Sequence, residues 1–328
     1  MATVTKLKAA VNNKNLPILG EDGNLYNYYF GRYFNKIVEK GYTLTSGEIT
    51  ALNAFIQDGI NNGWIDIVKY FLPLIGDSSH LDAAAVPLID EVGNYEMAEY
   101  DGTEDFSNSF EINSVNKKIK YYTRIVSGAS LLKSPLTIES MNGGISFSGY
   151  IPTPEVFDDG NIHNDYYASI KRNDANELNF GVRYHESSTE KIHQLMYLAN
   201  PSDTEMSYYR LDTPYKGLIE ELNLQGKALI VNYALYKKEN NEVWRLRNFV
   251  DADGNYNFTN YTPATPIEYP DYSANVLKMV FGQANPSSLT VPSQKFGCLG
   301  VLDAPNVTKS LVDSYNSAVF TLMAALGK

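Results

Sequence analysis

Short runs rich in Val, Ile, Leu, Phe and Tyr recur from about residue 119 onward, and turn-forming residues bound each of them. The runs are Ile119–Val126, Leu131–Ile138, Gly144–Ile151, Asp165–Lys171, Glu177–Tyr184, Lys191–Leu198, Met206–Leu211, Lys227–Tyr236, Glu242–Val250, Asn275–Gly282 and Gln294–Leu302. In the eighth run, Leu229 and Val231 fall on one face and Asn232 on the other, which is the two-residue period of a strand. Parallel strands need long crossover connections, usually helices, and no long helical pattern separates these runs. We therefore predict a mainly β, antiparallel β-sandwich.

Two amphipathic patterns near the N-terminus predict helices. The first covers Leu25–Lys40, where apolar residues recur every three or four positions, and Gly41 is placed to end it. The second begins at Thr45 and Glu48, which have the spacing of a capping box. Its expected apolar stripe is Ile49, Leu52, Ile56 and Ile60.

A nearly unbroken apolar run, Trp64–Gly76, follows the second helix and predicts a buried segment that Pro73 prevents from continuing as a regular helix. At the other end of the chain, apolar residues spaced by three or four predict a helix over 305–327. Pro305 lies near its start and Gly327 at its end.

These patterns divide the chain into three parts. Residues 1–24 are polar and Asn-rich and predict an extended arm for docking or assembly, residues 25–78 a helical segment, and residues 79–328 the sandwich, closed by the helix over 305–327. The apolar residues of the arm are the candidate assembly contacts: Val4, Leu7, Leu16 and Ile18.

Charge and composition exclude several classes of protein. The 27 Lys and Arg against 38 Asp and Glu give a net charge of −11, which disfavours binding to nucleic acid or to anionic membranes. No apolar run reaches the roughly 18–20 residues needed to span a bilayer, so no membrane insertion is expected. The first residues lack the apolar stretch of a secretory signal. The single Cys298 excludes an internal disulfide.

Motifs for catalysis or metal binding are missing from the sequence. It contains no G-x-S-x-G elbow and no glycine pattern for phosphate or dinucleotide binding. Asp251–Asn255 resembles the start of a calcium loop but lacks the later glycine and glutamate, and His185 and His193 lack further ligands. We expect no catalytic residue, cofactor or metal, although carboxylates distant in sequence leave polysaccharide hydrolysis open.

Tyrosine is abundant, with 25 residues, and several occur in adjacent pairs. On a strand, neighbouring side chains point to opposite faces, so a pair places one ring outward. Outward rings and one tryptophan are the candidate contacts for a glycan or a partner protein: Tyr122, Tyr167, Tyr209 and Trp244. The alternative is that tyrosine simply suits a half-buried sheet.

Two flanking segments carry a family resemblance. The block from Glu48 to Asp90 contains Gly63-Trp64 and then the run from Tyr70 to Gly76, and it resembles the segment ahead of concanavalin A-like sandwiches in tailed-phage virion proteins. The tail from Lys295 to Lys328 is similar to that family's closing strand, loop and helix. The middle of the chain departs from the pattern, and no lectin metal motif is present.

The resemblance implies a jelly-roll domain in a bacteriophage particle, as a head fibre, capsid decoration or tail-associated protein on the virion surface. Implied partners are other virion proteins and further copies of the chain, after synthesis in the host cytoplasm. Two alternatives stay open: a carbohydrate-binding module that recognises host surface glycans, and a polysaccharide-degrading enzyme.

Overall fold

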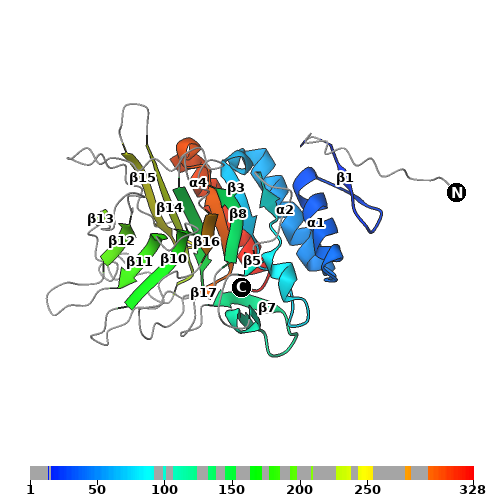
Figure 1. Ribbon diagram of the computed structural model, residues 1–328. Coiled ribbons are helices and arrows are strands. Elements are labelled where there is room, and N and C mark those ends of the chain that lie inside the picture. The colour runs from blue at the N-terminus through cyan, green and yellow to red at the C-terminus, as the bar shows by residue number, and fades with distance from the viewer. Residues whose placement is uncertain are drawn as a thin grey trace.

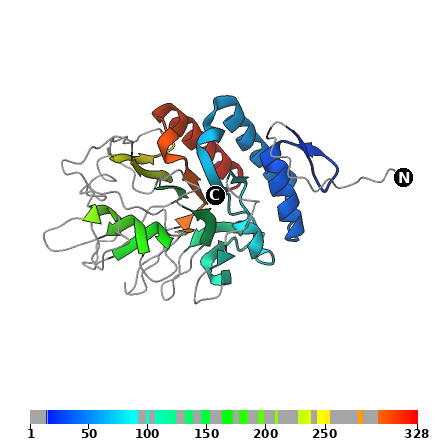
Figure 2. The same cartoon turned by 45° about the horizontal axis from the view of Figure 1, so that its top comes forward.

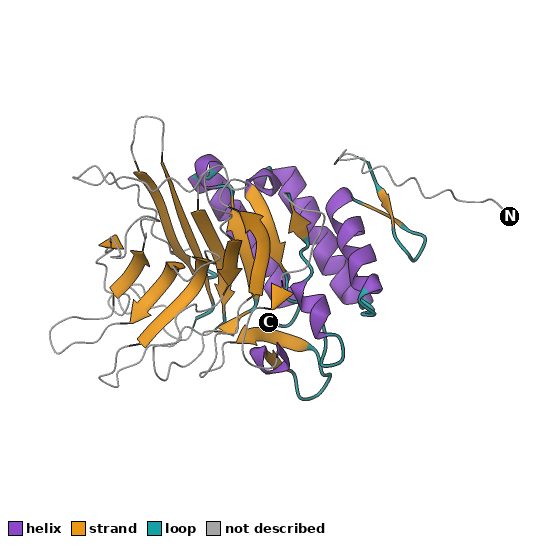
Figure 3. Ribbon diagram, viewed as in Figure 1, coloured by secondary structure: helices purple, strands orange, loops and turns teal. Residues whose placement is uncertain are grey.

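The computed structural model describes residue 14 and residues 16–91, 99–100, 106–123, 132–137, 145–152, 163–171, 177–184, 193–197, 208–209, 227–237, 243–253, 278–281 and 295–328. This part of the chain is mainly β, with two large antiparallel sheets and three α-helices (Figures 1 and 3). The arrangement is consistent with a β-sandwich.

The six-stranded sheet contains the first and last long strands of the fold. Its order is β15-β14-β9-β18-β3-β4. The bounds are β3 Val68–Leu72, β4 Ile89–Asp90, β9 Ile145–Ile151, β14 Leu229–Lys237, β15 Val243–Val250 and β18 Cys298–Leu302. Every pairing in it is antiparallel, and β3 lies between β18 and β4.

The seven-stranded sheet is built from the middle of the chain, in the order β13-β12-β11-β10-β16-β8-β5. Its strands are β5 Glu99–Tyr100, β8 Leu132–Thr137, β10 His163–Lys171, β11 Glu177–Tyr184, β12 His193–Tyr197, β13 Tyr208–Tyr209 and β16 Lys278–Phe281. Two smaller sheets are β17-β7-β6 and the hairpin β1-β2. Their bounds are β1 Ile18–Leu19, β2 Leu25–Tyr26, β6 Phe110–Ile112, β7 Ile119–Thr123 and β17 Lys295–Phe296.

Aromatic side chains join the two large sheets. The ring of Phe281, on β16, lies 6.5 Å from the ring of Tyr70 on β3 and 6.2 Å from the ring of Phe147 on β9. All three side chains are buried. Inner faces that pack through such side chains are typical of two stacked sheets.

The three helices cover the other face of the six-stranded sheet (Figure 2). They are α1 Tyr28–Glu39, α2 Ser46–Asn62 and α4 Lys309–Ala325. The ring of Tyr315, on α4, lies 5.5 Å from that of Trp64 and 6.4 Å from that of Phe71 on β3, and its hydroxyl lies 2.9 Å from Ser148 Oγ on β9. These contacts pack α4 and the Trp64 segment that follows α2 against the sheet.

The ends of the helices follow from local sequence. Asn27 caps α1 by accepting from the Phe30 amide, and Thr45 with Glu48 forms the expected capping box of α2. Gly41 and Gly63, which follow α1 and α2, adopt φ values of 80° and 75° that favour glycine. The capping box and the predicted end of the first helix at Gly41 are confirmed.

The predicted strands are confirmed over their described residues, with ends that differ by a few positions, except for Gln294–Leu302. That run is two strands rather than one, because Lys295–Phe296 is β17 of a small sheet and Cys298–Leu302 is β18 of the six-stranded sheet. Three other predictions are wrong. The helical segment does not span 25–78, because Leu25–Tyr26 is β2 and the first helix begins at Tyr28, whereas Val68–Leu72 is β3 of the six-stranded sheet. The last helix begins at Lys309, after a 3₁₀ turn at Ala304–Asn306 that contains Pro305. Ile60 of the expected stripe is exposed, whereas Phe55 is buried.

The extended arm also needs correction over its last residues. Ile18–Leu19 pairs with Leu25–Tyr26 as the hairpin β1-β2, which packs on α1. Only residues 14 and 16–24 of the arm lie within the described part of the chain. Residue 24 is therefore part of a folded hairpin rather than the end of an extended segment.

Candidate functional site at the N-terminal hairpin

The hairpin is closed by a turn whose chemistry is visible in the sequence. The Gly20 amide donates to the Asn24 carbonyl at 2.8 Å, and Gly23 adopts φ 83°. Asp22 accepts from the Asn24 side chain at 2.9 Å and from the Tyr26 hydroxyl at 2.7 Å, and the Tyr26 hydrogen bond lowers the pKa of Asp22. These contacts make the turn a defined structure.

One face of the hairpin is fastened to α1. Ile18 lies against Gly31, and the Tyr26 ring lies 4.8 Å from the ring of Phe30. Asn35 on α1 accepts from the Glu21 amide at 2.9 Å and donates to the Leu19 carbonyl at 3.1 Å. The hairpin is therefore held by apolar contacts and by hydrogen bonds to a helix side chain.

The opposite face of the hairpin presents leucines to solvent. Leu19 and Leu25 are direct cross-strand partners, and their exposed fractions are 53% and 68%. Leu16, just before the first strand, is 47% exposed. Leu19 and Leu25 are called here the leucine surface. Together with Leu16 they are half of the large hydrophobic residues exposed in the described part of the chain.

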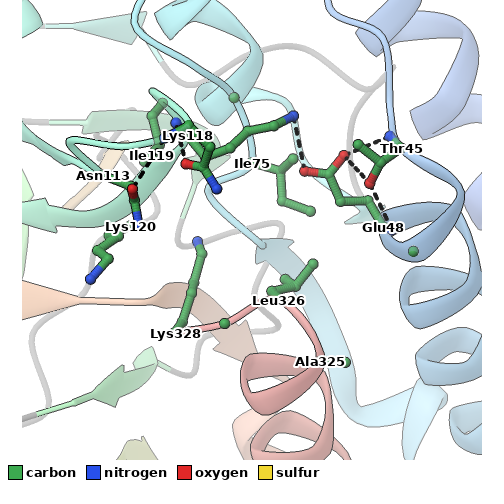
Figure 4. Close-up of a pocket in the computed structure, with 14 residues that line it drawn as sticks. Thr45, Glu48, Ile75, Asn113, Lys118, Ile119, Lys120, Ala325, Leu326 and Lys328 are labelled. Carbon is green, nitrogen blue, oxygen red and sulfur yellow. Dashed lines mark hydrogen bonds and ion pairs between the residues drawn. The ribbon is translucent and has the colours of Figure 1, made fainter.

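A pocket of about 360 Å³ lies where the start of α2 meets the β6–β7 turn and the last residues of the sequence (Figure 4). Lys118 Nζ lies 3.3 Å from Glu48 Oε1, contacts the Tyr42 hydroxyl and lies 4.3 Å from the centre of the Tyr42 ring. The Tyr42 hydroxyl donates to Glu48 at 2.9 Å, and burial raises the pKa of Tyr42. This tyrosine stays protonated near neutral pH.

Lys328 supplies a second ammonium group to the same pocket. Its Nζ donates to the carbonyl oxygens of Pro73, Leu74 and Gly297, each at 2.9 Å. Enclosure of this ammonium lowers its pKa to about 7. Oxygen atoms of the protein itself bind both Lys118 and Lys328. The pocket is therefore better explained as a contact between parts of the fold than as a ligand site.

A second concavity, the α2–α4 groove, has a volume of about 620 Å³ and opens between these two helices. Its apolar lining residues are Ala51, Ala54, Phe55, Ala318, Leu322 and Ala325. Phe55 and Leu322 are buried, whereas Ala54 and Ala325 are exposed. The groove is therefore open and partly apolar, and polar side chains such as Thr50, Asp58 and Thr321 also line it.

The predicted assembly residues have mixed outcomes. Leu16 is exposed. The expectation for Ile18 as a docking contact is wrong, because its side chain faces α1. Val4 and Leu7 lie outside the described residues. Sequence reasoning missed Leu19 and Leu25, although the two-residue alternation on either side of the Glu21–Asn24 turn could have indicated them.

Of the four aromatic candidates, the structure describes the side chain of one. Tyr122 is wrong as a surface contact, because it is fully buried with its ring 5.7 Å from that of Phe110. The backbones of Tyr167, Tyr209 and Trp244 lie in β10, β13 and β15, and their rings lie outside the described side chains. The structure does not bring these four residues together as a described site.

Other ionisable groups of the described residues are buried or paired with neighbouring side chains. Burial raises the pKa of the Cys298 thiol to about 12. Asp251 and Asp253 share the ammonium of Lys227, at 3.1 and 3.0 Å. No group of three or more potential metal ligands occurs among the described residues. Within the same part of the chain, no helix has the length and apolar character to cross a membrane.

Neither protein-family models nor curated proteins give a match to this sequence. The chain is similar to the solved structure of alginate lyase Aly36B, with a TM-score of 0.35 and 11% identity over 62% of this chain and 85% of that one. It is also similar to Trypanosoma rangeli sialidase in complex with sialic acid, with a TM-score of 0.37 and 8% identity over 84% of this chain and 40% of that one. For a Shewanella oneidensis MR-1 protein of unknown function, the TM-score is 0.33 and the identity 10%, over 74% of this chain and 91% of that one. With TM-scores below 0.5, these similarities carry no argument about function.

Proposed function

We propose that this chain is a non-enzymatic structural protein of a bacteriophage particle, a head fibre, capsid decoration or other surface component that docks through its N-terminal region. The observation that carries the proposal is the leucine surface. Leu19 and Leu25 are exposed together on a hairpin that α1 holds in place, and Leu16 is exposed just before it.

Exposed apolar residues that cluster on a fixed element are typical of an interaction surface. Leaving leucine in water forgoes about 1.5–3 kcal/mol of burial free energy for each fully exposed side chain. The hydrogen bonds from Asn35 and the packing of Ile18 keep the hairpin ordered, so docking there would require little further ordering. Docking onto a partner protein would explain why these leucines are exposed on an ordered hairpin.

The jelly-roll and concanavalin A-like assignment belongs to the same proposal. Two antiparallel sheets packed through Phe281, Tyr70 and Phe147 agree with it. The sequence resemblance over Glu48–Asp90 and Lys295–Lys328 supplies the link to virion proteins. Helices that cover one sheet and an N-terminal hairpin beyond α1 are compatible with attachment at that end (Figure 1).

The proposal is tested by incorporation into phage particles. In cells that assemble the particle, wild-type chain should sediment with it, whereas a Leu19→Ser/Leu25→Ser double variant should stay in the soluble fraction. Both leucines are exposed, so the variant should keep the stability of the wild type within about 0.5 kcal/mol. Val115→Ser is the matched control, because Val115 is 90% exposed on a different turn.

Particles that lack the wild-type chain would refute the virion role, and normal incorporation of the double variant would refute docking through the hairpin. Glycan recognition stays a prediction. Tyr122 is the one candidate ring that the structure describes, and because it is buried it gives this prediction no support. Polysaccharide degradation likewise stays a prediction, without a described residue that favours it.

A further inference from the structure

The strand β15 forms one edge of the six-stranded sheet and differs from the other edge strands of the protein. It pairs with β14 over eight consecutive positions, from Val243 to Val250, without a register shift. No strand in the described part of the chain pairs with its other side. The remaining edge strands of the four sheets are only two or three residues long: β1, β2, β4, β5, β6, β13 and β17. Among the described strands, β15 is therefore the one long edge.

The backbone of β15 is not protected in the usual ways. Proteins prevent a sheet edge from pairing with another chain by means of short edge strands, bulges, prolines and lysines. β15 contains neither proline nor lysine, and its register has no bulge. Alternate residues of a strand direct their backbone N–H and C=O groups to opposite sides, so about four of its residues present these groups away from β14. An extended backbone is the group that matches such a row of donors and acceptors.

The arginines of β15 disfavour a second copy of the same strand at this edge. Arg245 and Arg247 lie two positions apart and are therefore on the same face of the sheet. In a two-fold antiparallel pair of β15 strands, the two longest registers place Arg245 opposite Arg247, or Arg247 opposite its own copy. Like charges directly opposite each other destabilise strand pairing. The edge therefore suits a strand of different sequence.

The local charge of β15 favours an acidic partner. The strand carries two arginines and no acidic residue, although the chain has 38 Asp and Glu. At physiological ionic strength, charges more than about 8 Å away are largely screened, so these arginines matter more than the net charge of −11. Acidic residues at alternate positions of a partner strand would occupy positions opposite Arg245 and Arg247. Opposite charges at such positions stabilise strand pairing.

We propose that β15 binds an extended, acidic segment of another protein as an additional strand of the six-stranded sheet. Main-chain hydrogen bonds would supply the affinity, and the alternating charges would supply the specificity. The N-terminal hairpin packs on α1, at the other end of the molecule from β15 (Figures 1 and 2). This edge is thus a second contact surface, and the inference does not rest on the proposed function.

The test measures fluorescence polarisation of labelled peptides with the full-length chain. The first peptide is as long as β15 and alternates glutamate with valine, and it should bind saturably. A peptide with lysine in place of glutamate should bind about tenfold or more weakly. The glutamate peptide with every backbone nitrogen methylated has lost its backbone donors, so it should bind about as weakly as the lysine peptide.

Charge reversal in β15 tests the specificity. In Arg245→Glu/Arg247→Glu, the preference should reverse, so that the lysine peptide binds about tenfold or more tightly than the glutamate peptide. Lys117→Glu/Lys120→Glu is the matched control, because it changes the net charge by the same amount at the β6–β7 turn and in β7. This control should keep the preference for the glutamate peptide.

A pair of proline variants tests the backbone. Leu246 and Phe249 are three positions apart, so their N–H groups are directed to opposite sides of β15. One of Leu246→Pro and Phe249→Pro therefore removes a hydrogen bond to β14, and the other removes only an outward donor, which an edge strand tolerates. The variant that keeps the wild-type melting temperature should bind the glutamate peptide about tenfold or more weakly.

Several results would overturn the inference. They are an absence of saturable binding, equal binding of the glutamate and lysine peptides, wild-type binding of the methylated peptide, or an unchanged preference in Arg245→Glu/Arg247→Glu. Dimers of the wild type in sedimentation velocity that the tolerated proline abolishes would identify a second copy as the occupant and would also overturn it. Each of these results leaves incorporation through the leucine surface to be decided by its own experiment.

Discussion

A methyl group added at Gly31 should weaken the attachment of the hairpin to α1 while leaving the rest of the fold intact. Gly31 lies inside α1, and a Cβ there would be 2.5 Å from Ile18 Cβ and 2.9 Å from Ile18 Cγ2. Ordinary carbon–carbon contacts are about 3.5–4.0 Å, so Ile18 must retreat by about 1 Å or more. The strand that contains Ile18 must then shift away from the helix.

Two effects of Gly31→Ala oppose each other. Alanine stabilises a helix interior by about 0.5–1 kcal/mol relative to glycine. Full burial of an isoleucine contributes about 1.5–3 kcal/mol, and Ile18 is only partly buried, so its contact with α1 is worth about 1 kcal/mol. The hairpin opens locally, so we expect the melting temperature to stay unchanged or rise slightly. The open fraction of the hairpin should increase about fivefold, the equivalent of about 1 kcal/mol.

Hydrogen exchange measured by mass spectrometry separates the two effects. Amides of residues 18–26, including the Gly20 amide bonded to Asn24 and the Glu21 amide bonded to Asn35, should exchange faster in Gly31→Ala. Gly47→Ala is the matched control, because a Cβ on this α2 residue would have its nearest neighbour at 4.0 Å. A Gly31→Ala protein with wild-type exchange across the hairpin would refute the packing of Ile18 on α1.

Two further substitutions and one labelling experiment test individual contacts of the fold. Lys328→Met leaves three carbonyl oxygens without their donor and should cost about 1–3 kcal/mol in urea unfolding. Burial lowers the pKa of Lys328 from 10.5 to about 7, so the unfolded chain binds more protons in that interval. The wild-type free energy of unfolding should therefore rise with pH between these values relative to that of the variant, and parallel pH profiles would contradict this. Thr45→Ala removes the cap of α2 and should cost about 0.5–2 kcal/mol, whereas an unchanged denaturation midpoint would argue against the capping box. Cys298, with its pKa raised to about 12 in the buried strand, should resist thiol reagents until the chain unfolds, and fast labelling of the native protein would contradict its burial.

Alternation of apolar and other residues was sufficient to predict most strands, but it failed for β3. Val68–Leu72 is apolar except for Lys69, because both faces of the strand are covered. Phe71 packs towards Tyr315 of α4, and Tyr70 packs towards Phe281 of the other sheet. A strand covered on both faces shows little alternation of polar and apolar residues, so the sequence pattern predicts a helical segment that is too long.

The candidate site was only partly predictable, because which face is buried depends on long-range packing. The composition of the arm indicated assembly contacts, but the burial of Ile18 and exposure of Leu19 depend on where α1 lies. The adjacent pair that contains Tyr122 has the expected inward ring, yet the sequence could not tell that Tyr122 is the buried member. Local pattern gives the period of a strand, and only tertiary contacts give its orientation.

Immunogold labelling of purified phage particles with an antibody against this chain tests the central claim most directly. The claim predicts gold at repeated positions on the particle surface, and no gold on particles from cells that make only the Leu19→Ser/Leu25→Ser variant. Unlabelled particles beside abundant chain in the soluble lysate would contradict it.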